Sequence, residues 1–166
     1  MREIPVSIYS FIILLLVIIT GCDLASNRLQ QSDIELLAEN LELSYEFVEV
    51  REKADCLANK SLERCYVFQL SLTMPIAFKK LGWEIYFSLE NLVIKTESQE
   101  FSIEKINGEL HRLYAKEQFR GFKPQKTIQI LLATNARQLE NALLQPNFYV
   151  MGEGLKATVI KSSLAK

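Results

Sequence analysis

The chain has 166 residues, which is the length of one domain. Its 19 basic and 20 acidic residues give a formal net charge of −1, so nucleic acid, which attracts strongly basic proteins, is excluded as the expected partner. With 49% hydrophobic and 23% charged residues, the composition is that of an ordinary globular protein and excludes disorder throughout.

The first segment, Met1–Gly21, has the features of a secretory signal peptide. Arg2 makes its start weakly basic, and Phe11–Ile19 is an uninterrupted run of nine apolar residues. Such a run fits a signal helix and falls short of the roughly 20 residues that a membrane-spanning helix needs. A short membrane anchor and a buried strand are the alternatives for this run.

The signal segment ends in Ile19-Thr20-Gly21-Cys22. This sequence resembles the lipobox of bacterial lipoproteins, in which small residues precede a cysteine that is acylated after cleavage. The resemblance implies a lipid anchor at Cys22 and a place in the bacterial cell envelope, on the periplasmic side. Asp23, directly after the cysteine, resembles the signal for retention at the inner membrane.

Residues 22–40 are polar and predict a tether, with a helical turn around Ile34–Ala38. We expect the folded domain to occupy residues 41–166.

Cys56 and Cys65 remain once Cys22 is assigned to the lipid. Because an exported chain meets an oxidising compartment and the residues between the pair are polar, we predict a disulfide; two free thiols are the alternative. A tetrahedral zinc site would need four ligands, and the chain has one histidine, His111, so we expect neither a metal nor another cofactor.

Apolar and polar residues alternate along much of the remaining chain, which predicts short half-buried strands. Asn107-Gly108 separates two alternating runs and predicts a hairpin turn. Gln138–Leu144 is the one stretch that could be helical. Short strands without a long amphipathic helix indicate an all-β fold, a two-sheet antiparallel β-sandwich. The predicted strands lie at Leu41–Phe47, Tyr66–Leu72, Trp83–Leu89, Phe101–Ile106, Glu109–Leu113, Thr127–Leu132, Phe148–Val150 and Ala157–Ile160.

The sequence contains no nucleophile elbow, phosphate-binding loop, dinucleotide fingerprint or zinc motif. His111 stands in an alternating strand beside Arg112 and is interpreted as a half-exposed strand residue. Glu42, Glu46 and Glu49 line the polar side of the first strand as a solvated face. We therefore predict no catalytic residue and no enzyme activity.

Aromatic side chains are the remaining candidates for a binding site, because sugars stack their C–H faces on flat rings. Strand phase places Tyr86 opposite Trp83 and Phe87, so we expect Tyr86 to be exposed. The predicted sugar contacts are Tyr86, His111, Tyr114 and Tyr149. The rings that could form a platform are Trp83, Tyr86, Tyr114, Phe119, Phe122 and Tyr149, of which Trp83 and Phe119, together with Phe87 and Phe101, are expected in the core.

Three segments carry a family resemblance: Gly82–Ser88, Phe101–Leu113 continuing to Phe119–Phe122, and Pro146–Val150 with Val159-Ile160. Together they resemble the N-terminal domain of chitobiase and related bacterial β-N-acetylhexosaminidases of glycoside hydrolase family 20. The resemblance covers about Leu41 to Ser163. It implies a β-sandwich similar to cellulose-binding modules, placed before a catalytic barrel and inferred to bind polysaccharide.

The chain departs from this family at several positions. Catalysis in family 20 relies on an adjacent Asp-Glu pair in the barrel. Here no Asp is followed by Glu, and the resemblance implies that the chain ends where the barrel would begin. Ala115-Lys116 replaces a Pro-Thr pair. Arg137 and Phe148 stand where the family tends to have tryptophan.

These observations predict a non-catalytic, membrane-anchored lipoprotein with a polysaccharide-binding module, for chitin-derived or other N-acetylglucosamine-containing glycans. The expected partners are a polysaccharide or oligosaccharide and the membrane. An envelope structural or adaptor protein with a protein partner is the second hypothesis, and a truncated remnant of a hexosaminidase is the third.

Overall fold

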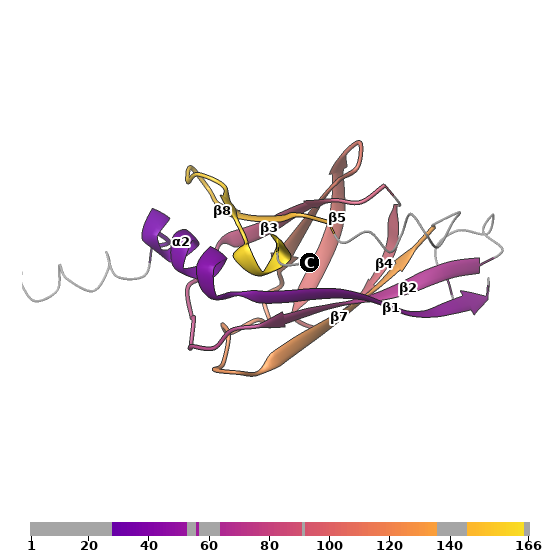
Figure 1. Ribbon diagram of the computed structural model, residues 1–166, viewed down its shortest axis with the longest axis horizontal. Helices are drawn as coiled ribbons and strands as arrows, with labels where there is room; N and C mark the ends of the chain where they lie inside the picture. The colour runs from indigo at the N-terminus through magenta and orange to yellow at the C-terminus, as the bar shows by residue number, and fades with distance from the viewer. Residues whose placement is uncertain (1–27, 53–55, 57–63, 91, 136–145, 165–166) are drawn as a thin grey trace, which may run out of the picture.

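A computed structural model describes residues 28–52, 56, 64–90, 92–135 and 146–164 as two antiparallel sheets packed face to face (Figure 1). This arrangement confirms the predicted all-β sandwich. One sheet has the order β1 (Glu42–Glu52), β2 (Arg64–Thr73), β7 (Thr127–Thr134), β4 (Val93–Glu97). The other has the order β5 (Phe101–Asn107), β6 (Leu110–Ala115), β3 (Trp83–Ser88), β8 (Phe148–Gly152), β9 (Thr158–Val159).

The core lies between the sheets and is built from alternate residues of each strand. Phe68, Leu70 and Leu72 of β2 face Ile85 and Phe87 of β3 across it, and all are buried. A strand points successive side chains to opposite faces, so the alternation read in the sequence is the alternation of burial.

Aromatic rings fill one end of this core. Trp83 stacks on Phe122 with ring centroids 5.5 Å apart and meets Phe119 edge-on at 5.8 Å. Phe119 in turn packs on Phe101 at 4.8 Å, and the Trp83 indole Nε1–H donates a 2.9 Å hydrogen bond to the Lys80 carbonyl. Trp83, Phe87, Phe101 and Phe119 are all buried, as predicted, and so is Phe122.

The segment before β1 differs from the expected tether. Residues Gln31–Asn40 form helix α2, whose Ile34, Leu37 and Ala38 are buried in the main core. These three apolar side chains recur at helical spacing, so one side of the helix covers the end of the sandwich. The predicted helical turn around Ile34–Ala38 lies within α2, which packs on the core and is not a free tether, while residues 22–27 lie outside the described residues.

The strand predictions succeed where alternation is regular. Gly108 has φ +54° in the β5–β6 turn, which confirms the hairpin at Asn107-Gly108. β4 was missed because all five of its residues are of intermediate burial and show no alternation. β1 continues beyond Phe47, where the predicted strand ended. A bulge between Phe47 and Glu49 shifts the phase of the strand there, so the alternation used for the prediction is interrupted.

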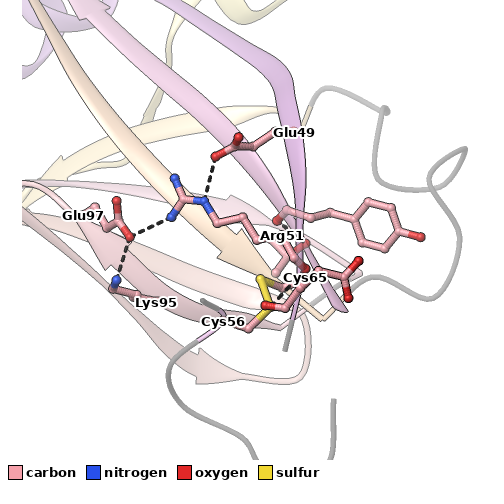
Figure 2. Close-up of a disulfide and its surroundings, with 9 residues drawn as sticks. Glu49, Arg51, Cys56, Cys65, Lys95 and Glu97 are labelled. Carbon is pink, nitrogen blue, oxygen red and sulfur yellow. Dashed lines mark hydrogen bonds and ion pairs between the residues drawn. A yellow bond between two sulfur atoms is a disulfide. The ribbon is translucent and has the colours of Figure 1, made fainter. Parts of the chain in front are cut away.

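Cys56 and Cys65 form the predicted disulfide, with their Cα atoms 5.7 Å apart. Both cysteines pack with Ala133 in a small second cluster on the side of β2 that faces away from the main core. Beside it, Arg51 of β1 pairs with Glu49 at 2.7 Å and with Glu97 of β4 at 2.9 Å (Figure 2). Arg51 thus joins the two edge strands of the four-stranded sheet.

Within the described part of the chain, no helix is long and apolar enough to cross a membrane. The predicted signal helix and Cys22, and also the possible helix at Gln138–Leu144, lie outside the described residues.

Candidate functional site

Three tyrosines share the outer face of the five-stranded sheet. In β3 the side chains of Trp83, Ile85 and Phe87 are buried, so Glu84 and Tyr86 point away from the core. The strand register continues this outer face onto both neighbours of β3, since Tyr86 pairs with Arg112 of β6 and Tyr149 of β8, and Glu84 pairs with Tyr114. We call this surface the tyrosine face; its residues are Glu84, Tyr86, Glu104, Arg112, Tyr114 and Tyr149.

Arg112 holds the tyrosine face together. Its Nη1 donates a 2.9 Å hydrogen bond to Glu84 Oε1, and its Nη2 donates one to Glu104 Oε1. The guanidinium carbon lies 5.1 Å from the centre of the Tyr114 ring, a cation–π contact. The Tyr86 hydroxyl donates a 2.6 Å hydrogen bond to Glu84 Oε2. Five of the six side chains, all but Tyr149, are therefore held by contacts within the face before any ligand arrives.

The charges on this face are well defined at neutral pH. Burial and the hydrogen bond to Glu84 raise the pKa of Tyr86, so its hydroxyl stays protonated. Burial lowers the pKa of Arg112, but the hydrogen bond to Glu104 and the charges of Glu84 and Glu104 outweigh it and raise that pKa. The face thus offers one cation between two carboxylates.

This arrangement suits binding. Tyr149 is 40% exposed, while Tyr86 and Tyr114 are half-buried, so all three side chains keep part of their surface in contact with solvent. Flat rings with adjacent fixed donors and acceptors match a ligand that has both C–H and hydroxyl surfaces. Among the described residues, no group of three or more His, Cys, Asp or Glu side chains could hold a metal ion.

His111 does not belong to this face, which corrects its prediction as a half-exposed residue and a sugar contact. It is fully buried, pairs across the sheet with Phe87 and Lys105, and stacks on the Phe87 ring at 5.7 Å. Its Nδ1–H donates a 2.8 Å hydrogen bond to the Glu109 carbonyl, and its Nε2 has no hydrogen-bond partner in the described residues. The next residue, Arg112, points to the outer face of the sheet instead.

Buried His111 is expected to make the domain less stable in acid. Burial chiefly, with a contribution from Lys105, lowers its pKa below 6.5, so the unfolded chain binds a proton that the folded chain resists. The contribution of His111 to the free energy of unfolding should be constant above about pH 7. As the pH falls below about 6.5, the free energy of unfolding should decrease by up to about 1.4 kcal/mol per pH unit.

Urea unfolding of the wild type and of His111→Phe between about pH 7.5 and 5 measures this effect, because carboxylates titrate mainly lower. The variant should lose the slope. Equal slopes in both proteins would mean that His111 is not responsible.

Sequence comparison identifies the domain that carries these residues. Residues 40–166 match the family model CHB_HEX, described as "Putative carbohydrate binding domain".

The chain belongs to this family of carbohydrate-binding domains.

Two curated relatives are similar to this chain over most of its length. The chain is 31% identical over 141 residues to a beta-hexosaminidase of Vibrio vulnificus and 24% identical over 149 residues to an N,N'-diacetylchitobiase of Vibrio harveyi. These matches cover 84% and 87% of the chain but only 16% and 17% of the relatives, so the chain spans a small part of their length. The resemblance predicted from the sequence motifs is confirmed.

Solved structures add one further finding. A GH20 exo beta-N-acetylglucosaminidase from Vibrio harveyi, in complex with N-acetylglucosamine, superposes with a TM-score of 0.46 at 7% identity, covering 73% of this chain and 17% of that one.

The CHB_HEX sandwich brings together three of the four predicted contact residues, Tyr86, Tyr114 and Tyr149, and excludes His111. Sequence reasoning missed Glu84, Glu104 and Arg112. Their strand phase was the available signal, since Glu84 has the phase of Tyr86 and Arg112 that of Tyr114.

One family departure can now be interpreted. Phe148, where the resemblance leads one to expect tryptophan, is buried and lies 5.2 Å from the Phe87 ring, so this position belongs to the core and not to the tyrosine face. Arg137, the second such position, lies outside the described residues.

Proposed function

We propose that the tyrosine face binds a polysaccharide and that the domain does so without cleaving it. The observation that carries the proposal is the cross-strand alignment of Tyr86 and Tyr149 beside the fixed Arg112 network, in a domain of a carbohydrate-binding family. The two rings are direct neighbours on adjacent strands, so a chain of sugar rings could lie across both.

N-acetylglucosamine-containing glycans, including those derived from chitin, are the ligands that we infer. The relatives' names, beta-hexosaminidase and diacetylchitobiase, support this class. On the tyrosine face, Tyr149 would stack on the C–H side of a sugar ring. Glu104 would accept hydrogen bonds from hydroxyl or acetamido groups of the sugar, and Arg112 would donate hydrogen bonds to them.

Replacing Tyr149 by Ala is expected to weaken binding of chitooligosaccharides at least about tenfold, the cost of about 1.4 kcal/mol of lost stacking contact. Tyr149 is exposed, so the fold should be unaffected. Isothermal titration of the wild type and the variant measures the loss. Val50→Ala, a truncation of a 46% exposed side chain on β1 of the other sheet, is the matched control and should bind as the wild type does.

Two results would contradict the proposal. Unchanged affinity in Tyr149→Ala would move the site elsewhere on the molecule. No heat with any glycan, from protein that unfolds cooperatively, would favour the adaptor hypothesis, in which the same face contacts another envelope protein.

We further propose that the chain is a lipoprotein of the bacterial cell envelope, acylated at Cys22 on the periplasmic side, with Asp23 favouring the inner membrane. Lipobox-like residues 19–22 support this anchor. Mass spectrometry of the N-terminal peptide tests it: diacylglycerol on Cys22 supports the anchor, and an unmodified Met1 terminus excludes it.

A further inference from the structure

Two loops at one end of the sandwich lie side by side. Residues 74–82 connect β2 to β3, and residues 116–126 connect β6 to β7. The two loops form an antiparallel bridge in which Phe78 N donates to Phe122 O at 3.1 Å and Phe122 N donates to Phe78 O at 2.8 Å. Gln125 N also donates to Met74 O at 2.7 Å. The loops therefore form one surface, which we call the basic end.

The basic end has a charge unlike that of the whole chain. Its two loops carry six basic side chains and one acidic side chain, Glu117, whereas the net charge of the chain is −1. Lys79, Lys123 and Lys126 are exposed and have no ion pair within the described residues. Gly121 packs so closely on the backbone of Lys79 that a Cβ would lie 2.8 Å from its Cα, which places the two positively charged loops in contact.

Large apolar side chains are exposed among these charges. Ile76 is 42% exposed and Leu81 49%, both in the first loop. Leu36 of helix α2 is 39% exposed and lines the same hollow as Leu81 and Lys79. Exposed leucine and isoleucine between lysines are typical of surfaces that enter the headgroup region of a bilayer, and nucleic acid would leave these apolar groups without a partner.

The polypeptide also enters the domain at this end. α2 and the β2–β3 connection lie at the same end of the sandwich (Figure 1). Lys80 Nζ donates a 3.3 Å hydrogen bond to the carbonyl of Arg28, the first described residue. Cys22 precedes Arg28 by six residues, which span at most about 22 Å when extended.

We propose that the basic end is a membrane-docking surface that binds the anionic headgroups of a phospholipid bilayer and inserts Ile76 and Leu81 among them. A lipid at Cys22, itself part of the proposed function, would hold this end within reach of the bilayer. The lysines supply attraction that acts over about 10 Å at 0.1 M salt, and the apolar side chains supply the contact. In this orientation the basic end of the sandwich contacts the bilayer.

The test uses the full chain in vesicles, with a single new cysteine at Leu81→Cys carrying an environment-sensitive fluorophore. Val50→Cys is the matched control, because Val50 lies on β1, outside the basic end, and is 46% exposed, against 49% for Leu81. In phosphatidylcholine vesicles containing phosphatidylglycerol, the label at 81 should shift its emission to shorter wavelength and be quenched by brominated lipid. The label at 50 should do neither.

Charge reversal at Lys79→Glu, Lys123→Glu and Lys126→Glu should abolish the shift, and raising the salt concentration should reduce it without any substitution. A label at 81 that stays in water with anionic vesicles would overturn the proposal, as would an equal shift with pure phosphatidylcholine. A shift produced by heparin without lipid would assign the surface to an anionic polysaccharide. Mass analysis of Cys22 separates failure of the anchor from failure of the docking surface.

Discussion

Replacing Trp83 by Ala is expected to lower the free energy of unfolding by about 3–5 kcal/mol. The indole touches three rings, those of Phe101, Phe119 and Phe122, so its removal leaves a cavity between residues that cannot all move inward. The Lys80 carbonyl would also lose its hydrogen bond from Trp83 Nε1. This loss would be a large part of the total stability of a domain of this size.

Urea unfolding followed by circular dichroism measures this change, because the variant lacks the only tryptophan of the chain. Trp83→Phe is the graded control and should cost less, since a ring remains. Tyr149→Ala should leave stability within about 0.5 kcal/mol as a surface substitution. A loss of under about 1 kcal/mol in Trp83→Ala would mean that the ring cluster does not bind the loops to the sheet as the packing indicates.

Removing the Cys56–Cys65 disulfide is expected to cost at most about 2.7 kcal/mol. The bond closes a loop of ten residues, and opening it restores conformational freedom to the unfolded chain. The folded strands should remain paired, because β1 and β2 contact each other along their whole lengths. The tyrosine face lies on the other sheet, so glycan binding should persist in the reduced protein.

Unfolding with and without reductant gives the difference, and the double variant Cys56→Ala, Cys65→Ala is the control. Reductant should destabilise the wild type and leave the double variant unchanged. A wild type that is indifferent to reductant, with the bond shown to be broken, would contradict the chain-entropy explanation.

Regular alternation made most of the strands predictable. In β3, apolar side chains recur at every second position, so burial and exposure could both be assigned before the structure. The same rule correctly separated Trp83 and Phe87 from Tyr86. Alternation did not predict β4, because all residues of Val93–Glu97 are buried to the same intermediate degree.

The binding face was predictable only in part, for a physical reason. Tyrosines could be identified as amphipathic side chains, but the partners of Arg112 come from β3 and β5, which are 28 and 8 residues away along the chain. His111 shows the opposite error. Its polarity indicated exposure, whereas a single hydrogen bond to the Glu109 carbonyl and the Phe87 ring allow it to lie in the interior.

The sequence by itself determined the sandwich, the disulfide pair and the family, because alternation, cysteine spacing and motifs are local along the chain. The tertiary structure decided which side chains meet. Strand order placed Tyr86 between Arg112 and Tyr149, and loop pairing brought Lys79 next to Gly121. Sheet pairing and loop contacts join distant segments, and their register depends on the packing of the whole core rather than on any one stretch of sequence.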